Sequence, residues 1–358
     1  MKKIWWRLGA LVLAVILLAG FFAGVVWMAG TRVTAYVNAA SAMFGETSAR
    51  AMCTMDVATG RVLFAHNADQ PMGMASTTKV VTALTLLENC TDLDTKIRVA
   101  DAAIGIEGSS IYLQKGEHLT VRELLYGLML RSGNDAAVAL ALAVSPSVAE
   151  FAELMNQTAA KYGATKTHFT NPHGLDDAEH YTTARDLAKL SAVALQNETF
   201  VEICSAKEYR IDGVDMPRVL INKNKLLKTL DGCIGVKTGY TKKTGRSFVG
   251  AREVDGQKIV CVVLNCGPMF PESAQLLKDA DAIYHNKTVL TAEEIFTDKH
   301  GTKGLALSDF SYPLSQTELD NLDITIVENT VIIKLHSETI YHGECVNLGD
   351  GTPGANTR

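Results

Sequence analysis

The sequence predicts a mixed α/β (α+β) protein in which an antiparallel sheet is flanked by helices and carries a helical subdomain. Strand patterns on either side of a mostly helical stretch, residues 101–200, predict this core. An apolar run over residues 8–30 predicts a transmembrane segment in front of it, and alternating residues in 291–358 predict a small β-rich module behind it. Hydrophobic residues make up 47% of the 358 residues, which suits a sizeable core, and the net charge of −5 gives no sign of a nucleic-acid surface.

The N-terminal residues predict the compartment. Lys2, Lys3 and Arg7 precede the uncharged run over residues 8–30, which is long enough to span a bilayer as a helix. Positive charge before the run keeps the N-terminus in the cytoplasm and sends the remaining chain outside. We expect an uncleaved anchor (residues 1–30) and a linker (31–45). Cleavage as a signal peptide stays open, because small-x-small sites end at Ala35 and Ala42.

Residues 46–290 are expected to form the main domain. "RAMCTMDVATGRVLFAHNADQPM" reads as a strand, a tight turn and a second strand, and helical spacing follows from Ser76 to Asn89. "VRELLYGLML", "DAAVALALAV" and "SVAEFAELMNQTAAKYG" predict further helices. Strands return at "CIGVKTGYT", "GRSFVGAREV" and "QKIVCVVLNC", and a last helix is expected around Glu272 to Tyr284.

Seven cysteines are an odd count with no CxxC pair. Several lie inside apolar runs, such as Cys261 in "KIVCVVLNC", and are expected to be small buried residues. A zinc site at Cys261 and Cys266 has the wrong spacing and no histidine pair, and a disulfide framework is not expected at this chain length.

Three short motifs carry the predicted chemistry. Ser76 is the one serine with a lysine three positions later, Lys79. On a helix this spacing puts the amine over the hydroxyl, and a helix N-terminus favours an oxyanion while disfavouring a protonated amine. A lysine whose pKa is lowered in this way can activate serine. Taken alone, the pattern is also that of an N-cap serine with a surface lysine.

The second motif, Ser132-Gly133-Asn134, is predicted in a loop between two helices, where ordinary turn chemistry is the alternative. The third, Lys-Thr-Gly, occurs twice. Lys237-Thr238-Gly239 ends an apolar strand, where a fixed side chain can point into a cleft, whereas Lys243-Thr244-Gly245 falls in a polar turn. We therefore assign the chemistry to the first copy and expect Lys243 to be a surface charge.

The order S-x-x-K, S-x-N, K-T-G is the signature of penicillin-recognising serine enzymes. The chain resembles the D-alanyl-D-alanine carboxypeptidases, low-molecular-mass penicillin-binding proteins of the S11 peptidase type, over about residues 51–284. Blocks such as "HFTNPHGLDDAEHYTTARDLAKL" and "GVKTGYTKKTGRSFVGA" also match. The resemblance implies a β-lactamase/transpeptidase-like fold.

The resemblance also implies a role for each motif residue. Ser76 would attack the carbonyl between two D-alanines, Lys79 would take its proton, and Ser132 would relay a proton to the leaving D-alanine. Asn134 would hold a substrate amide, and Lys237 and Thr238 would bind the terminal carboxylate. Gly239 would let the substrate approach the strand, and the backbone N–H groups of Ser76 and Tyr240 would form the oxyanion hole.

No metal or organic cofactor is implied. The expected partners are the peptidoglycan stem peptide, β-lactam antibiotics as covalent inhibitors and, through the N-terminal segment, the cytoplasmic membrane; nucleic acid is not expected. The protein is expected on the extracytoplasmic face of the bacterial cytoplasmic membrane, or secreted if the segment is cleaved.

Two features depart from the family pattern. The segment "NCGPMFPESAQLL" lacks the arginine that commonly helps to hold the substrate carboxylate, which leaves Lys237 and Thr238, with Arg246 as a further candidate. The C-terminal residues are polar where relatives often carry an amphipathic helix, so attachment is expected through the N-terminal segment.

Three alternatives stay open. A β-lactamase-like hydrolase would need a glutamate-held water, and Glu153 in "ELMN" is the available but poorly spaced glutamate. A catalytically weak cell-wall scaffold would keep the fold and lose the chemistry. The block "NPHGLDDAEH" also allows a metal-site hypothesis, less favoured because the same block is a loop signature of this non-metal family; its candidate ligands are His173, Asp176, Asp177 and His180.

Overall fold

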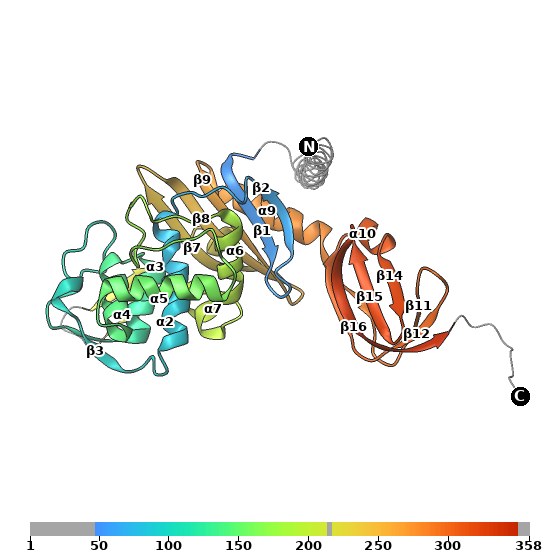
Figure 1. Ribbon diagram of the computed structural model, residues 1–358. Helices are drawn as coiled ribbons and strands as arrows, with labels where there is room; N and C mark the ends of the chain where they lie inside the picture. Colours follow the sequence, from blue (N-terminus) through green and yellow to red (C-terminus); the bar gives the residue numbers. More distant parts are fainter. Residues whose placement is uncertain (1–46, 213–216, 350–358) are drawn as a thin grey trace, which may run out of the picture.

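The structure is a computed structural model that describes residues 47–212 and 217–349. The predicted transmembrane segment and linker, residues 1–45, lie outside the described residues. Five antiparallel strands in the order β2-β1-β9-β8-β7 form the central sheet (Figure 1). They are β1 (Ala49–Asp56), β2 (Val62–His66), β7 (Cys233–Thr241), β8 (Gly245–Val254) and β9 (Gln257–Cys266). The strands predicted from the apolar runs are therefore confirmed, and β7 lies at one edge of the sheet.

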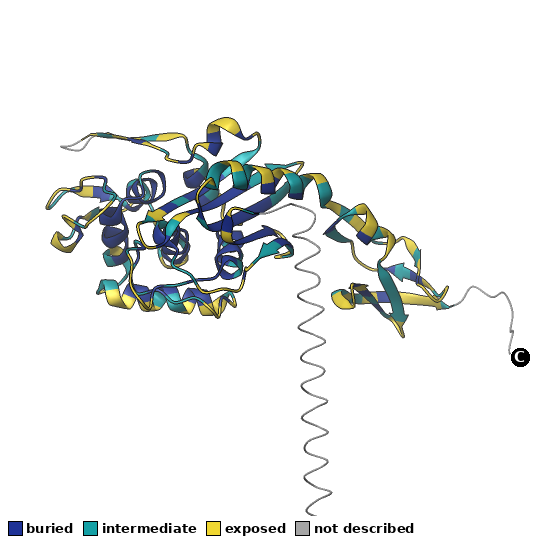
Figure 2. Ribbon diagram, turned by 90° about the horizontal axis from the view of Figure 1, so that it is seen from above, coloured by how far each residue is buried: buried dark blue, intermediate teal, exposed yellow. Residues whose placement is uncertain are grey.

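Both faces of the central sheet are covered, which explains the continuous apolar run of β9. Val260, Val262 and Leu264 face one core cluster, whereas Ile259, Cys261 and Val263 face another, because successive side chains of a strand point to opposite faces. Helix α9 (Met269–Ile283) packs on the second face, and α6 (Ala184–Ala194) on the first. Figure 2 shows the buried residues concentrated between these layers.

The helical region predicted for residues 101–200 lies beside the sheet (Figure 1). Its N-cap chemistry is regular: Thr120 and Glu123 form a capping box that begins α3, and Ser147 caps α5. Its helices are α3 (Val121–Leu130), α4 (Asn134–Val144), α5 (Val148–Lys161) and α7 (Glu198–Ser205), and α2 (Lys79–Asn89), which precedes this region in the sequence, packs with them. Short elements complete the region: η1 (Ala75–Thr78), η2 (Asp101–Ala103), α8 (Leu226–Thr229), the pair β3 (Lys96–Arg98) and β4 (His118–Thr120), and the pair β5 (Glu208–Ile211) and β6 (Arg218–Ile221).

The remaining described residues form a separate β-rich lobe after α9 (Figure 1). It contains a two-stranded sheet, β10 with β13, and a five-stranded sheet in the order β11-β12-β16-β15-β14. Its elements are β10 (His285–Leu290), β11 (Ile295–Thr297), β12 (Lys303–Ala306), β13 (Phe310–Leu314), α10 (Gln316–Asp320), β14 (Asp323–Val327), β15 (Thr330–Leu335) and β16 (Glu338–Gly349). Since β10 pairs with β13, the pairing of this lobe begins at His285, close to the boundary expected at residue 291.

Within residues 47–212 and 217–349, no single helix has the length and apolar composition of a membrane span. Only α4 and α5 taken together pass such a test, and they meet at a bend of 85°.

Candidate active site

The first motif lies at the start of a helix, as predicted. Ser76 belongs to the 3₁₀ turn η1, and Lys79 begins α2 directly behind it. The Lys79 Nζ atom lies 3.0 Å from Ser76 Oγ and 2.7 Å from Asn134 Oδ1, and it also hydrogen-bonds the backbone carbonyl of His173. The structure therefore joins the first and second motifs through one amine.

These three partners can all be satisfied by a neutral lysine if the Ser76 hydroxyl donates to the amine. The Asn134 Oδ1 and His173 carbonyl oxygens can only accept, so they take the two N–H donors of an uncharged amine. Its lone pair is then left for the Ser76 hydroxyl proton. The Lys79 side chain is fully buried, and burial, followed by the charges of Lys237 and Lys223, lowers its pKa well below the ordinary value.

Asn134 is held from both ends. Its backbone N–H donates to the Ser109 carbonyl at 2.7 Å, and its Nδ2 donates to the Glu107 carbonyl at 2.6 Å. This leaves Oδ1 directed at Lys79. The loop over residues 104–117 thus orients the Asn134 amide, and motif spacing alone gave no sign of it.

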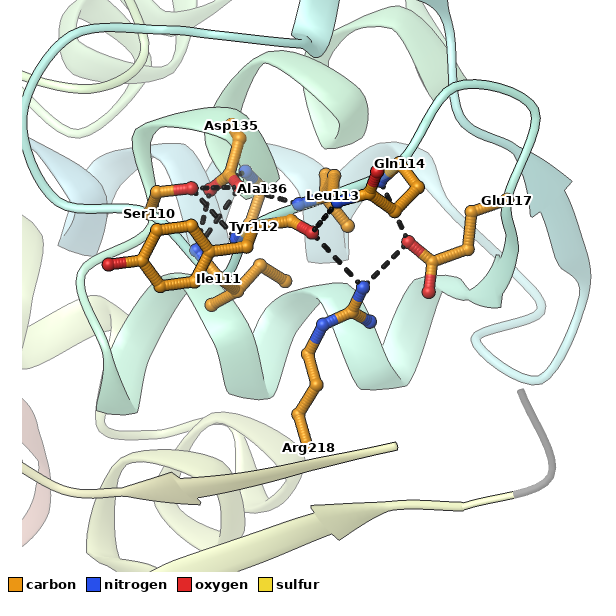
Figure 3. Close-up of polar contacts among 9 residues, drawn as sticks. All are labelled: Ser110, Ile111, Tyr112, Leu113, Gln114, Glu117, Asp135, Ala136 and Arg218. Atoms are coloured by element: carbon orange, nitrogen blue, oxygen red, sulfur yellow. Dashed lines mark hydrogen bonds and ion pairs between the residues drawn. The ribbon is translucent and has the colours of Figure 1, made fainter. Parts of the chain in front are cut away.

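The same loop is fixed by a buried carboxylate on α4 (Figure 3). Asp135 accepts hydrogen bonds from the Ser110 hydroxyl and from the backbone N–H groups of Ile111 and Leu113. On its other side, Arg218 forms an ion pair with Glu117 and donates to the Tyr112 carbonyl (Figure 3). Together these contacts hold Tyr112 at a φ of 61°, a conformation that bulky residues rarely adopt without such support.

Ser132 lies between α3 and α4, as the sequence predicts. Its backbone has a φ of 64°, and the residue is buried. It stands two positions before Asn134, the residue of this motif whose side chain contacts Lys79.

The first Lys-Thr-Gly copy lies on the edge strand β7. Lys237 is 1% exposed, and its Nζ donates to the Thr238 carbonyl at 2.9 Å. Burial, followed by the charge of Lys223, lowers the pKa of Lys237 to about 7. A buried amine whose counter-charge is supplied by a bound anion fits the expected carboxylate-binding role.

Gly239 brings β7 against the nucleophile turn. A Cβ atom at this position would lie 3.0 Å from the Met74 carbonyl oxygen and 3.2 Å from the Ser76 backbone nitrogen. Only glycine allows this approach without moving the backbone. The next residue, Tyr240, is 64% exposed, so the strand end beside Ser76 is open to solvent.

The second Lys-Thr-Gly copy forms the β7–β8 turn. Lys243 is exposed, as predicted. Thr244 is buried and packs against Gly73. Its hydroxyl lies 2.9 Å from the Thr241 hydroxyl, and either of the two can donate the hydrogen bond. Gly245 has a φ of 72°, which explains why a glycine follows the turn.

Lys223 is a functional candidate that sequence reasoning missed. Its Nζ donates to the Ser109 hydroxyl at 3.0 Å, and its charge lowers the pKa of both Lys79 and Lys237. Its backbone N–H donates to the Leu130 carbonyl, which ties it to the end of α3. No motif signals this residue, because its position depends on the β6 connection.

Arg246, the further candidate for carboxylate binding, pairs with Tyr240 across β7 and β8. Its side chain is exposed, and Nη1 lies 3.3 Å from the Gly267 carbonyl.

The residues of the metal hypothesis are engaged in loop packing. His180 uses both ring nitrogens: Nε2 lies 2.8 Å from Thr78 Oγ1, and Nδ1 accepts from the Thr170 N–H. Burial lowers the pKa of His180 to about 4. Asp176 accepts a hydrogen bond from Thr241. In the described part of the chain, no group of three histidine, cysteine or acidic residues is arranged to hold a metal ion.

All seven cysteines are free thiols. Burial raises the pKa of Cys53 and of Cys261 to about 12. Such thiols are small core residues, as the apolar runs around them predict.

The fold and this site define a serine enzyme of the penicillin-recognising class, and comparison with known proteins makes the family specific. The profile of the S11 peptidases, described as D-alanyl-D-alanine carboxypeptidase, matches residues 36–267. The chain therefore belongs to the D-alanyl-D-alanine carboxypeptidase family.

Individual relatives and solved structures belong to the same family. The chain is 34% identical to D-alanyl-D-alanine carboxypeptidase DacF of Bacillus subtilis over 62% of its own length and 59% of that protein. It is 31% identical to DacC of Escherichia coli over 78% of its length and 73% of that protein. The crystal structure of DacD from Francisella tularensis superimposes with a TM-score of 0.72 and 26% identity, over 85% of this chain and 94% of the other. The mixed α/β fold with antiparallel sheets is thus shared with solved family members.

Proposed function

We propose that the protein is a serine D-Ala-D-Ala carboxypeptidase that removes the terminal D-alanine from peptidoglycan stem peptides through a Ser76 acyl-enzyme. The observation that carries this proposal is the buried Lys79 amine, 3.0 Å from Ser76 Oγ and in contact with Asn134. Burial and the charges of Lys237 and Lys223 lower its pKa, which favours the neutral amine, and a neutral amine can take the hydroxyl proton as the nucleophile attacks.

The remaining residues divide the reaction as follows. Lys237 and Thr238 bind the terminal carboxylate, and Asn134 holds a substrate amide. The backbone N–H groups of Ser76 and Tyr240 stabilise the oxyanion, which the close approach at Gly239 supports. Ser132 passes a proton to the leaving D-alanine amine, and water then hydrolyses the ester bond to Ser76. β-Lactams acylate Ser76 in the same way and inhibit the enzyme.

A β-lactamase-like activity is less well supported. Fast deacylation would need a carboxylate to hold the water, but the partners of Lys79 are a hydroxyl, an amide and a carbonyl. Glu153, the available glutamate in the sequence, is exposed on α5.

The membrane attachment and domain limits belong to the same proposal. Residues 1–30 anchor the protein on the extracytoplasmic face of the membrane, 31–45 form a linker, 46–290 the peptidase domain and 291–358 a β-rich module. The intact mass of the membrane-bound protein tests the anchor. We expect a chain that keeps residues 1–30, and a chain that starts after Ala35 or Ala42 would contradict it.

Release of D-alanine from a diacetyl-lysyl-D-Ala-D-Ala peptide tests the activity. We expect multiple turnovers with the unsubstituted protein and none with Ser76→Ala. A protein that binds penicillin covalently but releases no D-alanine would be a penicillin-binding scaffold and would contradict the proposal.

A further inference from the structure

One face of the five-stranded sheet in the C-terminal lobe carries exposed aliphatic side chains (Figure 1). Ile295 on β11, Leu305 on β12 and Val346 on β16 are directly opposed in the strand registers, so their side chains lie in one row on one face. Ile295 is 62% exposed and Val346 is 42% exposed. Leu307 and Leu348, which adjoin the row along the chain, are 52% and 48% exposed. These five residues are called the outer patch.

The opposite face of the same sheet packs inside the lobe. Phe296, Ala306 and Cys345 each follow or precede a residue of the row, and all three belong to the core cluster of the lobe. Because successive side chains of a strand point to opposite faces, the row cannot join this core. A sheet face that meets only water is expected to carry polar side chains, so a contiguous outer patch indicates a surface that another molecule covers.

Two charged residues flank the row on opposite sides. Lys303 lies two positions before Leu305 on β12, and Glu344 lies two positions before Val346 on β16, which runs antiparallel to β12. The two charges are therefore about four strand residues apart, or roughly 14 Å, which is too far for an ion pair within one copy. Both side chains are exposed, and within residues 47–212 and 217–349 neither has an ion-pair partner.

A second copy of this chain would satisfy both the row and the charges. If two such sheets pack face to face about a two-fold axis along the row, each residue of the row meets its own counterpart. This axis reverses the strand direction of the second copy, so Lys303 of one copy lies at the level of Glu344 of the other, one strand away. A two-fold axis along the strands would instead bring the two lysines together. The charge pattern therefore selects one arrangement.

The charges next to the row disfavour a lipid surface as the occupant. Glu293 and Glu294 directly precede Ile295 and are exposed. An anionic bilayer surface attracts basic residues and repels carboxylates of this kind.

We propose that the outer patch is an interface between two copies of this chain, with the Leu305 row at its centre and reciprocal Lys303–Glu344 ion pairs at its edges. The inference goes beyond the proposed function and does not depend on it, because Ser76 and Lys79 lie in the main domain, away from this sheet (Figure 1).

Sedimentation velocity of the full-length chain in detergent tests the interface. We expect a dimer at about 10 μM. Leu305→Asp sets two carboxylates against each other on the axis, so it should raise the dissociation constant at least about 100-fold. Val219→Asp is the matched control, because Val219 is 52% exposed but lies on β6, outside the C-terminal lobe, and it should leave the dimer intact. Circular dichroism checks that each variant is folded.

Charge reversal tests the two-fold arrangement. Lys303→Glu and Glu344→Lys should each weaken the dimer at least about tenfold, because each creates a like-charge contact with the second copy. The double variant Lys303→Glu/Glu344→Lys should regain the affinity. An equal mixture of the two single variants should regain it as well, because each copy then supplies the charge that the other lacks.

Three results would overturn the proposal. The first is a full-length chain that sediments as a monomer at about 10 μM, and the second is a dimer that survives Leu305→Asp. The third is a double charge variant that stays as weak as the single variants, because the two charges would then not meet across a two-fold axis. The D-alanine release assay tests the serine chemistry separately, so failure of the interface and failure of the proposed function are distinguishable.

Discussion

Two copies of Lys-Thr-Gly lie on the same hairpin and have opposite environments. Lys237 is buried on β7 and its pKa is lowered to about 7, whereas Lys243 is exposed in the turn. Gly239 lies against the backbone of Ser76, whereas Gly245 supports the turn and lies against the Asn265 side chain. The tripeptide sequence alone therefore does not determine which copy is functional. The burial of its lysine and the distance of its glycine from the nucleophile distinguish the two copies.

The largest expected effect on activity is that of a substitution at Lys79, whose pKa is lowered by burial and by the charge of Lys237 in the buried copy. Lys79→Ala removes the base, so the rate of penicillin acylation should fall by about 10²–10⁴. Stopped-flow or gel-based labelling measures this rate, and circular dichroism checks the fold. Near-normal labelling of the folded variant would contradict the role of Lys79 as base.

The direct test of the two copies compares Lys237→Ala with Lys243→Ala. Loss of the buried amine removes the carboxylate partner, so we expect penicillin acylation of the first variant to be at least about 100-fold slower than that of the second. Equal rates, or a slower Lys243 variant, would reverse the assignment of the copies.

Gly239→Ala tests why the first copy can lie so close to Ser76. The new Cβ would lie 3.0 Å from the Met74 carbonyl oxygen, so β7 must move away, and acylation should slow by about 10- to 100-fold. Gly267→Ala is the control, because its Cβ would meet nothing within 4 Å. If both variants acylate alike, close approach at Gly239 is not required.

The lowered pKa of Lys237 predicts a pH dependence. Below pH 7 its amine is charged and binds the carboxylate, and above pH 7 the charge is lost, so kcat/KM for the peptide should fall about tenfold per pH unit on the alkaline side. On the acidic side the rate should rise with pH as Lys79 loses its proton. Arginine stays charged, so Lys237→Arg should lose the alkaline fall. If kcat/KM of that variant still falls on the alkaline side, the fall is caused by the titration of another group.

The smallest effect on activity is expected far from both copies. Arg61, between β1 and β2, forms an ion pair with Glu318 and lies over the rings of Tyr284 and Tyr312, which ties the sheet to the C-terminal lobe. Both charged side chains are about nine-tenths buried, so Arg61→Ala should lower the free energy of unfolding by about 3–5 kcal/mol. Penicillin acylation should stay unchanged. Urea denaturation measures the first effect, and a large loss of acylation at 25 °C in the folded variant would contradict the second.

Much of the fold follows from local pattern. The helix of "VRELLYGLML" and the strand that contains Cys261 lie where the pattern of apolar residues predicts them. A helix with one buried face has apolar residues three and four positions apart, and a strand buried on both faces has a continuous apolar run. The hairpin β1–β2 is confirmed for the same reason.

The candidate site was only partly predictable. The motif residues Ser76, Lys79 and Asn134 meet as the resemblance implies, but the supporting contacts come from segments without a local signal. Lys223 and the loop anchored by Asp135 reach the site through tertiary packing, and neither has a spacing that marks it. The cavity beside Lys243 and Thr244 is also lined by several segments that lie far apart in the sequence.

The most direct test of the central claim is the intact mass of the protein after exposure to benzylpenicillin, followed by mapping of the modified peptide. We expect one covalent adduct on Ser76, its absence in Ser76→Ala and its near absence in Lys237→Ala. An adduct that persists in Ser76→Ala, or full and rapid labelling of Lys237→Ala, would contradict it.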